Sequence, residues 1–167
     1  MGRAKAAAGS VVFLLIAPGI VAGVVPWWLT GWERRSFAAS APVGVLDVLL
    51  LVAGSLVLLH AFARFVVEGV GTPAPVAPTE RLVVGGIYRY VRNPMYLAVA
   101  ATIVGQSLLL GRLGLLLYAA AFVVVVVAFV RLYEEPTLAA RYGDGYEAYR
   151  RSVPGWLPRR RPWLGSL

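Results

Sequence analysis

The sequence contains no cysteine and only one histidine, His60. Without cysteine, the chain has neither a disulfide framework nor a thiolate metal site. A single histidine also argues against zinc catalysis and against a Ser-His-Asp triad, because both depend on histidine. We therefore predict a protein without a metal site.

Long apolar runs, by contrast, are abundant, since 59% of the 167 residues are hydrophobic. A helix needs about 20 apolar residues to cross a bilayer, and four runs come close to or exceed that length. They cover residues 7–30, 43–67, 94–110 and 115–133, the third being the shortest. We predict an all-α, polytopic membrane protein with about four transmembrane helices, forming a single domain over residues 1–167.

The first apolar run follows Arg3 and Lys5 and so has the start of a signal peptide. The run is long and further spans follow it, which favours a retained first helix instead. Proline and glycine interrupt this run and predict a kink or a thin packing face. The interrupting residues are Pro18, Gly19, Gly23 and Pro26.

The chain carries sixteen lysines and arginines against eight acidic residues, a formal charge of +8. These basic residues flank the apolar runs, so lipid headgroups explain them better than nucleic acid does. With the N-terminus inside, thirteen of the sixteen fall on one side, which predicts that both termini are cytoplasmic. The loop 68–93 and the tail 134–167 then face the cytoplasm. The abundance of Arg, Ala, Gly and Val is typical of a GC-rich bacterial genome, so we expect a bacterial cytoplasmic membrane.

The tail has the periodicity of an amphipathic helix. Leu138, Tyr142, Tyr146 and Tyr149 recur at helical spacing and fall on one face. Such a helix is suited to lie along the membrane surface. Gly143, together with Gly145, weakens its middle, so it could divide into two short helices.

Only residues 111–114 separate the third and fourth runs, which predicts a tight antiparallel hairpin. Runs of 17 and 19 residues differ by about 3 Å of helix, so their cytoplasmic ends are level. Arg92-Asn93 should therefore meet Glu134-Glu135. Acids at a helix C-terminus are unfavourable unless something offsets them. Either they pair with an arginine, or they hold a cationic or hydroxyl-rich ligand.

Two stretches then carry a family resemblance: "GIYRYVRNPMYL" at 86–97 and "EEPTLAARYGDGYEAYRRSVPGWLPR" at 134–159. Together they resemble the isoprenylcysteine carboxyl methyltransferase family and its phospholipid methyltransferase relatives, small membrane enzymes that use S-adenosylmethionine. The strong match covers about 69–159. The resemblance implies a cofactor pocket open to the cytoplasm, between the third span, the fourth span and the tail. The residues it implies for cofactor binding are Arg92, Asn93, Pro94, Tyr96, Glu134 and Glu135, with Tyr88 or Tyr96 offering an aromatic face to the sulfonium.

Asn93 departs from the family pattern, since many relatives have histidine there. An amide can hold a ligand but cannot shuttle a proton, so Asn93 is not an acid or base. No catalytic residue is identified by sequence alone. The candidates are Glu134, Glu135 and Arg131, and the candidates for the acceptor pocket are His60, Tyr146 and Tyr149.

We expect methyl transfer to a lipophilic acceptor, favouring a carboxylate because it needs no base. The alternatives are a phospholipid amine N-methyltransferase, an NADPH-dependent membrane reductase of related architecture, and a non-catalytic membrane protein. A reductase would need several arginines for the 2′-phosphate, and the only arginine run is 159–161. The expected partners are the lipid bilayer and a lipid-like substrate, and the sequence does not indicate an oligomeric state.

Overall fold

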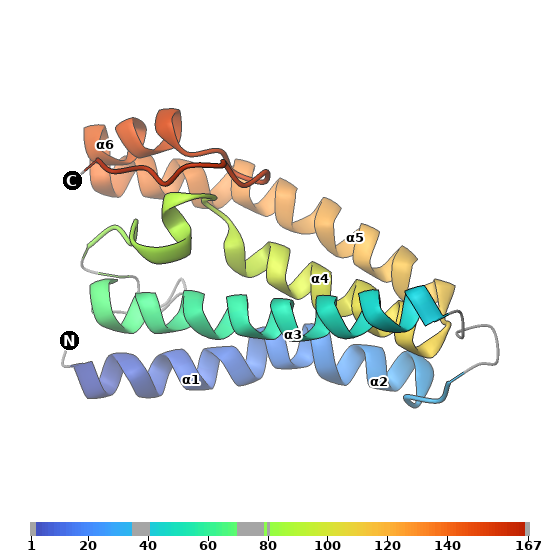
Figure 1. Cartoon of the computed structure of the whole chain (residues 1–167). Coiled ribbons are helices and arrows are strands. Elements are labelled where there is room, and N and C mark those ends of the chain that lie inside the picture. Colours follow the sequence, from blue (N-terminus) through green and yellow to red (C-terminus); the bar gives the residue numbers. More distant parts are fainter. Residues whose placement is uncertain (1–2, 35–40, 70–78, 80, 166–167) are drawn as a thin grey trace.

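The computed structural model describes residues 3–34, 41–69, 79 and 81–165, and every regular element in these ranges is a helix. The long helices run lengthwise beside one another (Figure 1). The first helix begins at the end of the bundle where the C-terminal segment also ends, as the predicted topology requires. The predicted all-α polytopic architecture is confirmed.

Three helices are long and apolar enough to cross a membrane, and a fourth apolar helix is shorter. The long ones cover Ala8–Thr30, Gly44–Glu68 and Leu113–Ser152, and the shorter one is Pro94–Leu110. In chain order the elements are α1 (Arg3–Gly19), η1 (Ile20–Val24), α2 (Val25–Thr30), α3 (Ala41–Arg64), η3 (Phe65–Gly69), η4 (Gly86–Arg89), α4 (Pro94–Leu110), α5 (Leu113–Phe129), η5 (Val130–Glu134) and α6 (Glu135–Ser152).

The interruption expected in the first span is the wide π-helical turn η1, which ends two residues before Pro26. Proline has no N–H and crowds the preceding turn, and a wide turn relieves both problems. Two carbonyls of this turn accept hydrogen bonds from the hairpin: Val21 from the Tyr118 hydroxyl at 2.9 Å and Ala22 from Gln106 Nε2 at 2.6 Å. The backbone groups are thus satisfied within the bundle, as a membrane interior demands.

The hairpin of α4 and α5 has the predicted tight turn. Pro94 occupies the first turn of α4, where its missing N–H costs nothing. At the other end Gly111 adopts a left-handed conformation with φ of 64°. The Gly111 N–H donates to Leu108 O and the Arg112 N–H donates to Ser107 O, which together close the helix. This hairpin returns the chain to the level at which α4 began.

Helices α3 and α4 approach closely at two glycines. A Cβ on Gly54 would lie 2.6 Å from Thr102 Oγ1, and one on Gly105 would lie 3.0 Å from the Asp47 carbonyl oxygen. Small residues at such contacts are typical of helix packing in membranes. The core beside them contains Val99, Ile103, Leu110, Leu115 and Ala119.

The helix of the fourth predicted span continues past residue 133, because α5, η5 and α6 form one continuous helix. The π-helical turn η5 ends two residues before Pro136, as η1 does before Pro26. The bend comes later, at Gly143, where φ is 53° and ψ is −131°. The weak point expected at this glycine is therefore confirmed.

The aromatic face of α6 packs against the protein itself. Tyr146 and Tyr149 are almost fully buried, and Leu82, Val84 and Trp163 pack around them. The amphipathic pattern predicted for the tail is present, and the aromatic part of its apolar side is covered by the chain itself.

Candidate functional site

The two halves expected to meet do meet, at the end of the bundle where α4 begins. Arg92 Nη1 donates to Glu135 Oε1 at 2.8 Å, and the Tyr96 hydroxyl donates to Glu134 Oε2 at 2.9 Å. Each contact joins the start of α4 to the junction of η5 and α6. The convergence inferred from helix lengths is thus present in the structure.

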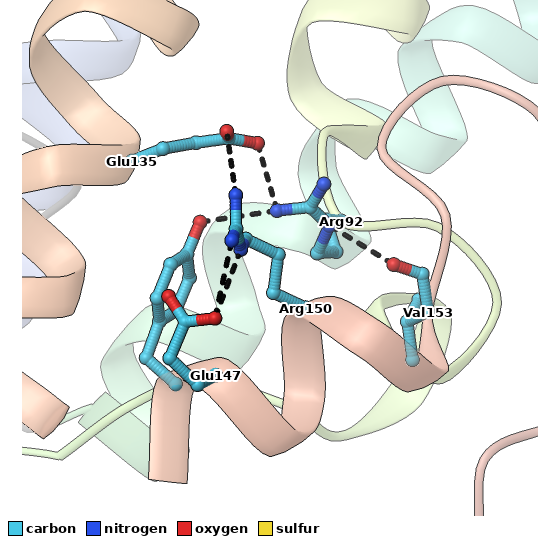
Figure 2. Close-up of polar contacts among 6 residues, drawn as sticks. Arg92, Glu135, Glu147, Arg150 and Val153 are labelled. Atoms are coloured by element: carbon cyan, nitrogen blue, oxygen red, sulfur yellow. Dashed lines mark hydrogen bonds and ion pairs between the residues drawn. The ribbon is translucent and has the colours of Figure 1, made fainter. Parts of the chain in front are cut away.

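Arg92 is the centre of this junction (Figure 2). Besides Glu135, it donates from Nη1 to the Tyr146 hydroxyl at 3.0 Å and from Nε to the Val153 carbonyl at 2.9 Å. On the other side of Glu135 lies Arg150, with Nη1 3.9 Å from Oε2. One carboxylate is therefore flanked by two guanidinium groups. The pairing with an arginine that the sequence left open is present for Glu135.

Two other polar groups of the site have no such partner. Among the described residues, Asn93 Nδ2 and the Tyr88 hydroxyl are buried and make no hydrogen bond. Asn93 is 7% exposed and Tyr88 is 5% exposed. An unpaired buried polar group is costly, and these two are among six such side-chain atoms in the described residues. Both line the same cavity, so a polar occupant of that cavity would satisfy them.

The cavity has a volume of about 510 Å³, which is in the range of small-molecule sites. Its polar end contains the paired and unpaired groups described above. The remaining wall is mostly apolar, and its apolar residues come mainly from α1, η1, α3, η3, α4 and α5. The apolar lining includes Phe13, Ala17, Val21, Phe62, Phe65, Phe122 and Phe129. One end of the cavity can thus hold a polar molecule, while the other suits a hydrocarbon.

Burial alters the ionisation of the groups at the polar end. It raises the pKa of the Tyr88 hydroxyl well above the usual range, and Tyr149 and Glu134 add to the rise. Tyr88 therefore stays protonated and can donate a hydrogen bond. Burial also raises the pKa of the Glu134 carboxyl, the first residue beyond the apolar run 115–133, and the hydrogen bond from Tyr96 opposes this rise.

Of the acceptor-pocket candidates, Tyr146 and Tyr149 line the cavity, as do all the residues expected at the cofactor. The Tyr149 hydroxyl donates to the Tyr88 carbonyl at 2.7 Å and so fixes the backbone of η4. His60 lies elsewhere: its side chain is exposed and lines a second cavity beside Ile87 and Tyr90. Arg131 is exposed and does not line the main cavity.

Sequence reasoning missed the turn that starts η4. The Gly85 N–H donates to Glu68 Oε2 at 2.9 Å, and Glu68 pairs with Arg64. A Cβ on Gly85 would collide with both side chains. Gly86 follows with φ of 57°, a conformation that favours glycine. The adjacent glycines Gly85 and Gly86 are the feature of the sequence that could have indicated this turn.

The segment after α6 was also missed as part of the site. It runs from Val153 past Gly155 and lies against Arg92 and Asn93. A Cβ on Gly155 would lie 3.3 Å from Arg92 Nη2 and 3.4 Å from Asn93 Nδ2. This segment has no helical or strand periodicity from which its position could be predicted. No group of three or more metal-ligating side chains occurs in the part of the chain that the structure describes.

Comparison with known proteins gives two matches. The sequence profile of the family described as phospholipid methyltransferase matches residues 43–145. Protein-S-isoprenylcysteine O-methyltransferase of Schizosaccharomyces pombe is 38% identical over 80 residues, which are 46% of this chain and 33% of that relative. The match thus spans about a third of the relative's length. No solved structure matches the chain.

Proposed function

The chain belongs to the phospholipid methyltransferase family, and from this premise we propose that it transfers a methyl group from S-adenosylmethionine to a lipophilic acceptor. The reaction would take place at the cytoplasmic face of a membrane, which we take to be a bacterial cytoplasmic membrane. One observation carries the proposal: a single cavity has a polar end at Arg92, Asn93 and Glu134 and an otherwise apolar wall.

The residues at the polar end fit the chemical groups of S-adenosylmethionine. The amino group and ribose hydroxyls of this cofactor donate hydrogen bonds, and the carboxylates of Glu134 and Glu135 can accept them. Its carboxylate needs donors, and the unpaired Asn93 amide and Tyr88 hydroxyl supply them beside Arg92. When bound, this cofactor supplies an electrophilic methyl group on a sulfonium cation.

Within this proposal the chain's own residues bind, align and exclude water. Tyr96 and Tyr88 offer aromatic faces that attract a cation. The apolar wall keeps water from the acceptor, and alignment with a dry environment supplies the rate enhancement. Asn93 holds the ligand and carries no proton.

For the acceptor we propose a lipid-linked carboxylate, because it is already deprotonated and requires no base. The name of the fission-yeast relative supports this choice. A phospholipid amine is the second candidate, and the matching family profile favours it. An amine must lose a proton first, and the Glu134 carboxylate, which lines the cavity, would accept it.

Labelling separates these acceptors. The purified protein is incubated with methyl-labelled S-adenosylmethionine and an extract of membrane lipids and prenylthiols. Base-labile label on a lipid would indicate an ester and support the carboxylate. Base-stable label would indicate an amine or a thioether and overturn that choice. No label on any lipid would contradict the proposed activity itself.

The reductase alternative places its cofactor near the arginine run 159–161, but none of these arginines lines the main cavity. A non-catalytic role predicts that the cluster around Glu135 only holds the helices together. Under that role Glu135→Ala would leave S-adenosylmethionine binding unchanged, whereas the proposed enzyme would lose it.

A further inference from the structure

The segment 153–165, which we name the strap, follows α6 without forming a helix. Four backbone hydrogen bonds join it to the residues immediately before α4. They are Arg92 N–H to Pro154 O (2.9 Å), Asn93 N–H to Gly155 O (3.2 Å), Arg159 N–H to Tyr90 O (3.0 Å) and Trp163 N–H to Arg89 O (3.0 Å). The strap is therefore hydrogen-bonded to the same stretch of chain that supplies Arg92 and Asn93 to the cavity.

One turn of the strap lies against the first turn of α4, where a membrane span is predicted to begin. The Trp156 ring is 6.4 Å from the ring of Tyr96, which stands in the first turn of α4. Next to it, the Leu157 side chain is 79% exposed. Tryptophan prefers the membrane interface, and an exposed leucine beside it suits the edge of the hydrocarbon layer. This turn is positioned to touch the bilayer.

Three consecutive arginines follow that turn directly. The Arg159 side chain is bonded within the protein, since its Nη1 donates to the Ser152 carbonyl at 2.7 Å. Arg160 and Arg161 are exposed, and neither forms an ion pair with any residue that the structure describes. Basic clusters next to a membrane are attracted to anionic lipid headgroups. Charge and position thus point to the same occupant, an anionic lipid surface.

We propose that the strap docks on the anionic surface of the membrane in which the protein sits, with Leu157 at the hydrocarbon edge and Arg160 and Arg161 on lipid phosphates. Because the strap is bonded to the backbone of Arg92 and Asn93, docking steadies that backbone. Anionic lipid then tightens the polar end of the cavity. Only the consequence for the cofactor rests on the proposed function, since the docking itself does not need it.

Hydrogen–deuterium exchange on the full chain, without cofactor, tests the docking. The protein is placed in nanodiscs of phosphatidylcholine alone or of phosphatidylcholine with phosphatidylglycerol. Amides in residues 86–93 and 153–165 should exchange about fivefold more slowly in the anionic discs. Arg160→Gln with Arg161→Gln should abolish the difference. Arg81→Gln with Arg151→Gln removes the same charge from exposed sites outside the strap and should preserve it.

Equal exchange in the two kinds of disc would overturn the proposal, as would a difference that survives Arg160→Gln with Arg161→Gln. Inorganic phosphate added to the phosphatidylcholine discs should change nothing. If it slows exchange equally, the occupant is a free anion and the docking is refuted. A protein that binds no S-adenosylmethionine in either disc but shows the exchange difference would refute the proposed function and leave the docking intact.

Discussion

The hairpin of α4 and α5 has polar contacts at both of its ends, and arginine is used differently at each. At the open end, Arg92 pairs with a largely buried Glu135 beside a cavity that also contains unpaired donors. At the turn end, Arg112 donates to the Thr30 and Glu33 carbonyls, at 3.4 Å and 3.3 Å. Its carboxylate partner there, the Glu33 side chain, is 81% exposed at 3.6 Å.

The two ends of the hairpin therefore differ in role: the contacts at the turn end hold a loop, and those at the open end form part of a binding site. Contacts to backbone carbonyls close the turn end, and neither Arg112 nor Glu33 lines the main cavity. The open end keeps a largely buried charge pair and leaves Asn93 Nδ2 without a hydrogen-bond partner among the described residues, which costs stability. A fold tolerates such a cost where a ligand recovers it. Variants at the two ends should therefore respond differently to a ligand.

The largest effect is expected for Glu135→Ala. It leaves the largely buried Arg92 guanidinium without its carboxylate, and S-adenosylmethionine binding should weaken about hundredfold. Titration calorimetry in nanodiscs measures the affinity, and circular dichroism checks that the helices persist. Glu33→Ala at the turn end is the matched control and should bind like the parent protein. Affinities within twofold for both variants would remove the distinction between the ends.

The next effect is expected for Asn93→Ala. Because the amide has no partner in the free protein, its loss should change the free energy of unfolding by less than about 1 kcal/mol. Binding should nevertheless weaken about tenfold, since a donor to the ligand disappears. Ser107→Ala is the converse control: its hydroxyl donates to the Arg112 carbonyl at 2.8 Å, so stability should fall while binding holds. Thermal unfolding and calorimetry on the same samples measure the stability and the affinity of both variants. A loss of stability for Asn93→Ala without weaker binding would contradict the account.

A smaller effect on binding is expected for Gly85→Ala. The new Cβ would displace Glu68 and Arg64 and shift the start of η4, weakening cofactor binding about fivefold by misplacing Tyr88. Gly114→Ala serves as control because a Cβ there meets nothing within 4 Å. That control should bind normally and be as stable as the parent or slightly more so. Unchanged binding and stability in Gly85→Ala would show that the turn is not needed in this form.

The smallest effect on binding is expected for Arg112→Gln. It should lower the free energy of unfolding by about 1 kcal/mol, through the lost bonds to carbonyls. S-adenosylmethionine affinity should not change, because the residue lies at the far end of the hairpin. Thermal unfolding with and without the cofactor measures both quantities. A weakened affinity would mean that the two ends are coupled.

Much of the fold follows from local signals. The helix 94–110 was predicted with the bounds that α4 has, because proline starts it and a glycine with positive φ ends it. The meeting of Arg92 with Glu135 followed from the lengths of two neighbouring helices.

What sequence reasoning missed depends on contacts between distant segments. Acidic residues and a proline at 134–136 looked like a helix end, but the wide turn η5 lets the helix continue past Pro136. The strap is held by backbone bonds to residues 89–93, and backbone bonds leave no pattern of side chains. His60 was one candidate for the acceptor pocket, and the structure places its side chain at the second cavity.

Titration of the purified protein in nanodiscs with S-adenosylmethionine and, separately, with NADPH tests the central claim most directly. The account predicts saturable binding of S-adenosylmethionine that Glu135→Ala weakens about hundredfold and Glu33→Ala leaves intact, together with no saturable binding of NADPH. Saturable binding of NADPH without S-adenosylmethionine would contradict it.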